Sequence, residues 1–600
     1  MTQSLYLPHD VTREDRADGA IILRARQPLG KVAMRTTDWL DHWAQATPDA
    51  VFLAERSGAG WREVTYSSAR DTARALAGGL LGLGLGPDRP VMVISGNGVD
   101  HGLLALAAQY VGIPLVPVAE QYALIPAARP QLDFVAGLTR PGLIYAEDGA
   151  ALEGVFQREA FAGTHKLVSR NPGTGELSVD ELIRQGGDIS AAHAAVGADT
   201  VAKILMTSGS TSAPKGVLTT HRMLCTNQTQ IAQALPFLKT RPPRIVDWLP
   251  WNHVFGGSHN FNMMLANGGA LYVDSGKPVP GLVDRTIENL RLKTGTITFN
   301  VPVGFAKLRD VMREDKALRR AYFEELDMLF YSGASLPQDV WADLEAMARE
   351  VRGEMPLFTS SWGLTETAPA AILQHEPTDR SGIVGVPLPG VDVKLIPDDD
   401  LRCEVRVAGP SVFAGYLHDP ARTADAFDDE GYFCTGDAMK FVDPDNINLG
   451  LRFDGRISEE FKLLTGTWVR AANLRLDVLG ALGPLAGDVI VTGADRSEIG
   501  VMIVPSPALR AAVAAADPGA LWSVGAAADI RRALAPIGTG SSTRIARALI
   551  LAEPPQIAEG EITAKGNLNF RKLLTRRADL LDRLYDDADP ATILITGNVP

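Results

Sequence analysis

Residues 206–216 read MTSGSTSAPKG and follow an apolar run, AKILMTS (202–208), that is predicted to be a buried strand. Small residues let backbone N–H groups approach a phosphate, hydroxyls donate hydrogen bonds, and a lysine supplies positive charge. This combination predicts a loop that binds a polyphosphate. Its predicted contacts are Thr207, Ser208, Gly209, Ser210, Thr211 and Lys215.

The loop is not a P-loop, because Lys215 is followed by Gly216, whereas a P-loop needs Gly-Lys-Ser/Thr at the start of a helix. A solvated Ser/Gly-rich loop is the other interpretation of the same residues. Few such loops combine this density of hydroxyls with a Pro-Lys-Gly end.

Apolar strand patterns alternate with helical patterns through much of the chain, for example at 91–95, 99–110 and 113–118. Alternation of this kind indicates an α/β fold with mostly parallel sheets flanked by helices. Six hundred residues are too many for a single core. We expect a large N-terminal domain of parallel-rich sheets with a small β-rich subdomain after Gly385 (1–455) and a smaller, mobile C-terminal α/β domain (456–600). The first thirty-odd residues are expected to form an arm.

Bulk composition limits the partners. A net charge of −13 argues against a nucleic-acid surface, which needs clustered Lys and Arg. The three cysteines are far apart and form no ligand pattern, which favours a cytoplasmic protein without disulfides or structural zinc. The most apolar stretch, 102–118, is interrupted by polar residues and is interpreted as core, so no membrane partner is expected. The oligomeric state is left open, with a homodimer as one possibility.

Three more segments accompany the loop: YSGASLP (331–337), SWGLTET (361–367) and YFCTGD (432–437). Together, in this order and at this spacing, the four segments resemble the signatures of adenylate-forming enzymes. That group contains acyl-CoA synthetases, adenylation domains of peptide synthetases and luciferases. The resemblance extends from about residue 35 to 585, with Ser212 in place of a usual Gly and Trp362 in place of a usual Tyr.

The resemblance implies roles for these residues. Asp437 would accept hydrogen bonds from both ribose hydroxyls of ATP, with Arg456 as a second ribose contact. Glu366 would hold Mg²⁺, since a carboxylate suits a magnesium ion that is also bound by phosphates. The adenine would lie beside the ring of Trp362. The remaining nucleotide contacts implied are Gly333, Ala334, Ser335, Gly363 and Thr365.

The closing motif, GEITAKGNLNFR (560–571), resembles the family segment with the adenylation lysine, although its order is Lys-Gly where Gly-Lys is usual. Lys565 is assigned that role, and Lys572 is the alternative. A cation is needed because a carboxylate attacks an anionic phosphate, and such electrostatic stabilisation is often worth ~3–4 kcal/mol. With Lys565, the predicted catalytic residues are Thr207, Glu366 and His253.

The acid pocket is expected around 248–257 and the strand end near Asn300, which are aromatic and apolar with few polar groups. Its predicted residues are Trp251, His253, Phe255, Phe261 and Asn300; His253 could also be a packing histidine. The segments 249–261, 300–305, 461–469 and 540–544 are similar to feruloyl-CoA synthases. This similarity implies a hydroxycinnamate such as ferulate as the acid, CoA as the thiol, and a CoA channel near Gly466 and Trp468.

Several other functions remain as alternatives. These are a ligase for another aryl or medium-chain acid, an adenylating enzyme that loads a separate carrier protein, luciferase-like oxidation, and a catalytically impaired nucleotide-binding relative. A serine hydrolase is disfavoured, because the sequence has no Gly-x-Ser-x-Gly elbow.

Overall fold

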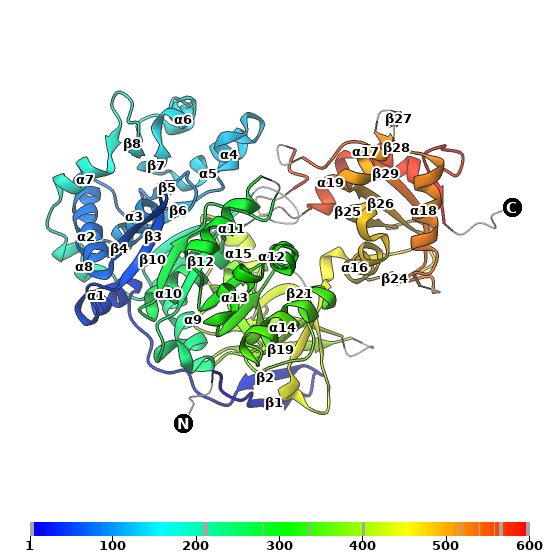
Figure 1. The fold of residues 1–600 in the computed structure, drawn as a ribbon, viewed down its shortest axis with the longest axis horizontal. Coiled ribbons are helices and arrows are strands. Elements are labelled where there is room, and N and C mark those ends of the chain that lie inside the picture. The colour runs from blue at the N-terminus through cyan, green and yellow to red at the C-terminus, as the bar shows by residue number, and fades with distance from the viewer. Residues whose placement is uncertain are drawn as a thin grey trace.

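The computed structural model describes residues 5–207, 214–279, 281–333, 336–398, 402–513, 515–517, 519–538, 540–556, 559–562 and 568–595. Figure 1 shows a large body, coloured blue to yellow, and a smaller body at one side, coloured yellow to red. Among the described residues, no helix combines the length and the apolar character needed to cross a bilayer.

The first sheet of the large body has seven strands in the order β11-β10-β6-β5-β7-β8-β9. All neighbours are parallel except β10 and β11, which form an antiparallel hairpin. The strands are β5 (Val91–Val93), β6 (Leu115–Pro117), β7 (Leu143–Asp148), β8 (His165–Arg170), β9 (Leu177–Ser178), β10 (Val201–Thr207) and β11 (Lys215–Thr220). Helices that precede these strands or lie between them in the sequence include α2 (Tyr66–Gly82), α3 (Val99–Tyr110), α5 (Arg129–Thr139), α6 (Gly149–Phe156) and α7 (Val179–Gln185). The predicted helix at 99–110 and the predicted core at 102–118 are both confirmed.

The second sheet has eleven strands in the order β1-β2-β19-β20-β21-β22-β18-β17-β16-β15-β14. Only β14, β15 and β16 are parallel to one another; the other pairs are antiparallel. The strands are β14 (Ile297–Asn300), β15 (Met328–Tyr331), β16 (Leu357–Gly363), β17 (Ala370–Leu373), β18 (Ile383–Pro387), β19 (Asp392–Pro397), β20 (Arg402–Ala408), β21 (Phe433–Phe441) and β22 (Leu451–Arg456). The strands after Gly385 that were predicted as a β-rich subdomain, β19 to β22, therefore belong to the same eleven-stranded sheet as the parallel strands β14, β15 and β16. Helices α11 (Val283–Leu292), α12 (Pro302–Glu314), α13 (Lys316–Glu324) and α14 (Gln338–Arg352) contribute to a hydrophobic cluster with its parallel strands.

The expected N-terminal arm is part of this sheet. Strands β1 (Val11–Asp15) and β2 (Ile21–Ala25) form a hairpin, and β2 pairs antiparallel with β19. Ile22 and Leu23 are buried, so the hairpin is held by both backbone pairing and apolar packing. The prediction of an arm overlooked the short apolar run AIIL (20–23) before Arg24.

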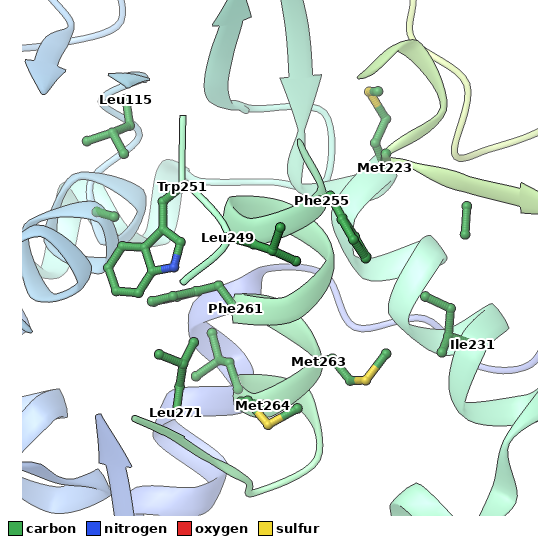
Figure 2. Packing of buried hydrophobic residues seen from close by; sticks show 14 of the residues in the cluster. Leu115, Met223, Ile231, Leu249, Trp251, Phe255, Phe261, Met263, Met264 and Leu271 are labelled. Atoms are coloured by element: carbon green, nitrogen blue, oxygen red, sulfur yellow. The ribbon is translucent and has the colours of Figure 1, made fainter. Parts of the chain in front are cut away.

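A third sheet has the order β12-β13-β3-β4 and consists of β3 (Val51–Ser57), β4 (Gly60–Thr65), β12 (Arg244–Asp247) and β13 (Ala270–Val273). Between β12 and β13 the chain forms a π-helix, η4 (Phe255–Asn260), that continues directly into α10 (Phe261–Ala266). Figure 2 shows apolar side chains from this helical segment packed beside α9 (His221–Ala234). π-helical turns are rare and often occur at functional sites.

The smaller body follows η7 (Ile457–Glu459). It contains a hairpin, β23 (Phe461–Lys462) and β24 (Trp468–Val469), and a sheet of order β25-β26-β29-β28-β27, with β30 beside β29. The strands are β25 (Ala486–Thr492), β26 (Ile499–Pro505), β27 (Ala515–Asp517), β28 (Ala520–Leu521), β29 (Ile545–Leu551) and β30 (Ile593–Leu594). The helices include α16 (Ala471–Leu482), α18 (Val524–Leu534), α19 (Phe570–Arg576) and α20 (Ala578–Leu584). This body has hydrophobic clusters of its own, from Leu463 onward.

Candidate active site

The predicted phosphate loop lies at the end of the β10–β11 hairpin. Thr207 is the last residue of β10 and Lys215 is the first of β11, and the two are partners in the strand register. Ser208, Gly209, Ser210 and Thr211 lie outside the described residues. The hairpin therefore fixes the two predicted phosphate contacts at either end of the loop opposite each other.

A tyrosine that sequence reasoning missed joins this hairpin to the predicted metal-binding carboxylate. The Tyr416 hydroxyl donates to Glu366 Oε1 at 3.0 Å, and the ammonium of Lys215 lies 4.6 Å from the centre of the Tyr416 ring. Burial, and then the charge of Glu366, raise the pKa of Tyr416, so its hydroxyl remains a donor. Tyr416 is fifty positions from Glu366, and its segment is held near Glu366 by a β-bridge between Tyr416 and Val217 and by the backbone hydrogen bond from Phe413 to Glu366. The only sequence signal was a Gly-Tyr pair, which is too common to identify it.

Glu366 lies in a short helical turn, η5 (Thr365–Thr367), directly after β16. Its side chain is largely buried, and its backbone carbonyl accepts a hydrogen bond from Phe413 at 2.8 Å. Among the described residues, no group of three His, Cys, Asp or Glu side chains could hold a metal ion alone. One carboxylate beside a predicted phosphate loop fits Mg²⁺, which is commonly bound by one or two carboxylates together with substrate phosphates.

The predicted ribose site is formed by three side chains in direct contact. Asp437 and Arg456 are register partners on β21 and β22, with Arg456 Nε 3.3 Å from Asp437 Oδ1. The indole Nε1 of Trp362, on β16, donates to Asp437 Oδ2 at 2.8 Å. Burial raises the pKa of Asp437, while the positive charge of Arg456 and the hydrogen bond from Trp362 act in the opposite direction. Asp437 is 3% exposed, so these two neighbours, with little help from water, favour the ionised form of its carboxyl group.

The carboxyl ends of the parallel strands β14, β15 and β16 meet at one edge. Asn300 and Tyr331 are register partners there, and Ser332 N–H donates to the carbonyl of Asn300 at 3.3 Å. The Asn300 side chain accepts from Trp248 Nε1 at 3.2 Å. Gly333 has φ +90°, a conformation that favours glycine. Gly363 ends β16, while Ala334 and Ser335 lie outside the described residues.

The predicted acid-pocket residues are divided between two aromatic groups. Trp251 and Phe261 (Figure 2) lie 5.1 Å apart between ring centres. Phe52 packs against Phe261, and His101 packs against Trp251. Phe255 lies on the opposite side of the same helical segment and packs with three rings that prediction did not select: His259, Phe299 and Phe330. The structure therefore does not bring all of the predicted pocket residues together.

His253 precedes the π-helix and is half-buried. Phe255 N–H donates to its Nδ1 at 3.2 Å, so the ring proton of a neutral His253 is on Nε2. His253 Nε2 is thus a hydrogen-bond donor.

A profile of the family described as "AMP-binding enzyme" matches residues 40–417. The chain belongs to this family. It is an ATP-dependent adenylating enzyme of the group that contains the acid–CoA ligases.

Individual relatives of this AMP-binding enzyme are distant. Luciferin 4-monooxygenase of Luciola mingrelica is 25% identical over 393 residues, which cover 62% of this chain and 68% of the relative. Long-chain-fatty-acid–CoA ligase FadD15 of Mycobacterium bovis is 25% identical over 507 residues, or 77% of this chain and 80% of the relative. The solved structure of o-succinylbenzoate–CoA synthetase from Bacillus subtilis with AMP has a TM-score of 0.68 and 18% identity, covering 91% of this chain and 98% of that one. This likeness confirms the predicted fold class of a large sheet-rich domain with a smaller C-terminal one.

In the C-terminal part of this AMP-binding enzyme, Lys565 lies outside the described residues. The residues on either side of it are in contact, because Ile562 and Leu568 form a β-bridge. Next to this bridge, the buried carboxylate of Glu561 accepts two hydrogen bonds from Arg577, each 2.8 Å long. Lys572 lies on α19. Gly466 and Trp468 are on the β23–β24 hairpin, where Trp468 is 59% exposed.

Proposed function

We propose that this AMP-binding enzyme is an ATP-dependent ligase that couples a hydroxycinnamate such as ferulate, or a closely related aryl acid, to CoA. The observation that carries the proposal is the line of contacts from Lys215 through Tyr416 to Glu366. It links a predicted phosphate contact to a predicted magnesium ligand. The predicted ribose carboxylate, Asp437, accepts a hydrogen bond from Trp362 on β16, the strand that precedes Glu366.

In the first half-reaction, an oxygen of the acid carboxylate attacks the α-phosphorus of ATP, and the bond to pyrophosphate breaks. Asp437 accepts the ribose hydroxyls, and Thr207 and Lys215 bind the phosphates. Glu366 would hold Mg²⁺ together with the phosphates, and the ion would supply positive charge that offsets the repulsion between the phosphates and the incoming carboxylate. Lys565 adds a cation at the oxygens where negative charge accumulates. His253, as an Nε2–H donor, orients the acid carboxylate.

In the second half-reaction, the CoA thiolate attacks the acyl carbon, a thioester forms and AMP leaves. We propose that 456–600 form a mobile domain that carries Lys565 away and brings Gly466 and Trp468 to the pantetheine channel. The hydrophobic clusters support this division, because those of the large body end at Leu451 and those of the smaller body begin at Leu463. Exposure of Trp468 fits a residue that contacts CoA in another domain position. We propose the cytoplasm as the location of the enzyme, because the three cysteines are far apart in sequence and suggest no disulfide framework.

The proposed acid rests on the sequence similarity at 249–261 and on the aromatic character of the site. Phe255, Phe299 and Phe330 lie near the ends of β14 and β15, where a ligand of a parallel sheet is expected. A flat aryl acid suits such a lining better than a flexible alkyl chain does.

The test is AMP release in the presence of CoA, measured with cinnamates, benzoates and medium-chain acids. We expect hydroxycinnamates to have the highest kcat/KM. A higher value for medium-chain acids would contradict the aryl assignment. Acid-dependent ATP–pyrophosphate exchange without CoA-dependent AMP release would favour a carrier protein as the acceptor.

A further inference from the structure

A buried chain of hydrogen bonds runs from the end of β12 into the π-helix. Asn260 Nδ2 lies 2.9 Å from Asp247 Oδ2, and Asn260 Oδ1 lies 2.9 Å from His259 Nδ1. Asp247 and Asn260 are 1% and 0% exposed, and His259 is fully buried. No part of the proposed mechanism uses these three side chains.

In this chain of hydrogen bonds, every donor points toward Asp247. Leu249 N–H donates to Asp247 Oδ1 at 3.2 Å, and the amide group of Asn260 donates to Oδ2. The amide oxygen of Asn260 is then an acceptor, and His259 must donate to it from Nδ1. Burial lowers the pKa of His259 to about 4, so the ring is neutral and its Nε2 carries a lone pair. The hydrogen bonds from His259 through Asn260 to Asp247 therefore leave His259 Nε2 as a hydrogen-bond acceptor.

This acceptor has no hydrogen-bond partner among the described residues. It lies within an aromatic lining: the His259 ring centre is 5.1 Å from that of Phe330 and 5.5 Å from those of Phe255 and Phe299. Buried polar atoms in native proteins nearly always have partners, so an acceptor built into apolar surroundings needs an explanation. A ligand that brings a donor into the aromatic lining would supply the missing partner.

The π-helix sets the position of the acceptor. A side chain at Gly256 would collide with the carbonyl oxygen of Leu249, and one at Gly257 with that of Trp251, at 2.3 and 2.1 Å. Two adjacent glycines thus let η4 press against the segment that follows β12. The backbone carbonyl of His259 is also held, by Gln228 Nε2 at 3.2 Å. His259 is therefore fixed at its backbone, at Nδ1 and by the three rings.

We propose that His259 Nε2 accepts a hydrogen bond from the phenolic hydroxyl of the acid, whose aromatic ring lies among Phe255, Phe299 and Phe330. This inference rests on the proposed function, because it assumes an aryl acid in this site. It narrows the substrate class to acids with a hydroxyl donor at the end remote from the carboxylate. A methyl ether or an unsubstituted ring at that end would leave the acceptor buried and unpaired.

The test compares three acids of similar shape, 4-hydroxycinnamate, 4-methoxycinnamate and cinnamate, by AMP release with CoA at pH 8. At this pH His259 is neutral, and Asp247, whose pKa burial raises to about 7, is mostly ionised. We expect kcat/KM for 4-hydroxycinnamate to exceed that for each of the other acids by about 10-fold or more. In His259→Phe, which keeps a ring but has no acceptor, the ratio should fall to about one.

The matched control is Ser258→Ala, which removes a buried hydroxyl one residue away that also has no partner among the described residues. It should keep the wild-type ratio. A second measurement needs no variant: in the protein with ¹⁵N-labelled histidine, 4-hydroxycinnamate should shift the Nε2 resonance of His259, and cinnamate should not.

Four results separate the outcomes. A wild-type ratio near one overturns this proposal alone, and so does a wild-type ratio that persists in His259→Phe. An Nε2 resonance that responds equally to both acids also overturns it, since His259 then serves only in packing. Absence of acid-dependent AMP release with all three acids overturns the proposed function, and this inference with it.

Discussion

Replacing Trp362 with phenylalanine would remove one hydrogen bond from the proposed ribose carboxylate while keeping an aromatic ring beside it. The indole Nε1 donates to Asp437 Oδ2 at 2.8 Å, and Arg456 is 3.3 Å from the other oxygen. Trp362 is 6% exposed and Asp437 is 3% exposed, so water is poorly placed to substitute for the lost donor.

The size of the effect follows from the charge on Asp437. A hydrogen bond to a charged group contributes about 1.5–3 kcal/mol, which corresponds to about 10- to 150-fold in a binding or rate constant. We expect kcat/KM for ATP to fall by at least the lower figure in Trp362→Phe. The preference for ATP over 2′-deoxy-ATP should also decrease, because a less firmly held carboxylate discriminates the ribose hydroxyls less well.

The pH profile gives an independent reading of the same contact. Burial raises the pKa of Asp437, and Trp362 is one of two neighbours that lower it. Without the indole donor the pKa rises further. Because ribose binding uses the ionised carboxylate, activity is lost as pH falls through this pKa. The acid limb of the profile should therefore move to higher pH in Trp362→Phe.

ATP–pyrophosphate exchange at saturating acid, between pH 6 and 9, measures both effects. Trp43→Phe is the matched control, since it removes an indole hydrogen bond to the carbonyl of Ala266 at 3.3 Å that has no contact with Asp437. The control should keep the wild-type KM for ATP. If Trp362→Phe retains both the wild-type kcat/KM for ATP and the wild-type acid limb, the assigned role of this hydrogen bond is refuted.

Three further predictions concern the metal, the lysine and the C-terminal body. Tyr416→Phe removes the hydroxyl donor from the proposed magnesium ligand and should raise the Mg²⁺ concentration for half-maximal exchange by about 10-fold; an unaltered Mg²⁺ titration would contradict this. Lys565→Ala should reduce exchange by about 10²–10³-fold and spare thioester formation from presynthesised acyl-adenylate, whereas Lys572→Ala should retain both steps; the reverse pattern would move the assignment to Lys572. Glu561→Ala leaves the buried guanidinium of Arg577 without its carboxylate partner and should cost about 3–5 kcal/mol in denaturant unfolding of the C-terminal body. Its control, Glu559→Ala, removes an exposed ion pair and should cost under about 1 kcal/mol; equal costs would show that burial is irrelevant there.

Local sequence patterns were sufficient for much of the architecture. The helix at 99–110 and the strand before the predicted phosphate loop follow from apolar periodicity, which reports local burial directly. The approach of Asp437 and Arg456 was implied by family resemblance, and strand register places them as partners. The helix and the strand depend on interactions within short segments, so the residues that determine them are adjacent in the sequence.

Features that depend on tertiary contacts were not predictable in the same way. Tyr416 meets Glu366 across fifty positions of chain, and nothing near either residue indicates the other. The N-terminal hairpin joins a sheet whose next strand, β19, lies more than 360 residues later. The aromatic residues at 251–261 were predicted as one pocket, but the helical turn directs Phe261 and Phe255 to opposite sides. His259 was overlooked because its role as a hydrogen-bond acceptor follows from its contact with Asn260 and, through Asn260, with Asp247.

The most direct measurement is a structure of the full chain with a non-hydrolysable hydroxycinnamoyl-adenylate analogue bound. We expect its ribose hydroxyls on Asp437, the group that replaces the phosphate between Thr207 and Glu366, and the phenol against His259. An analogue whose adenosine lies away from Asp437 and Trp362, or whose phosphate mimic is remote from Thr207 and Lys215, would contradict the proposed site.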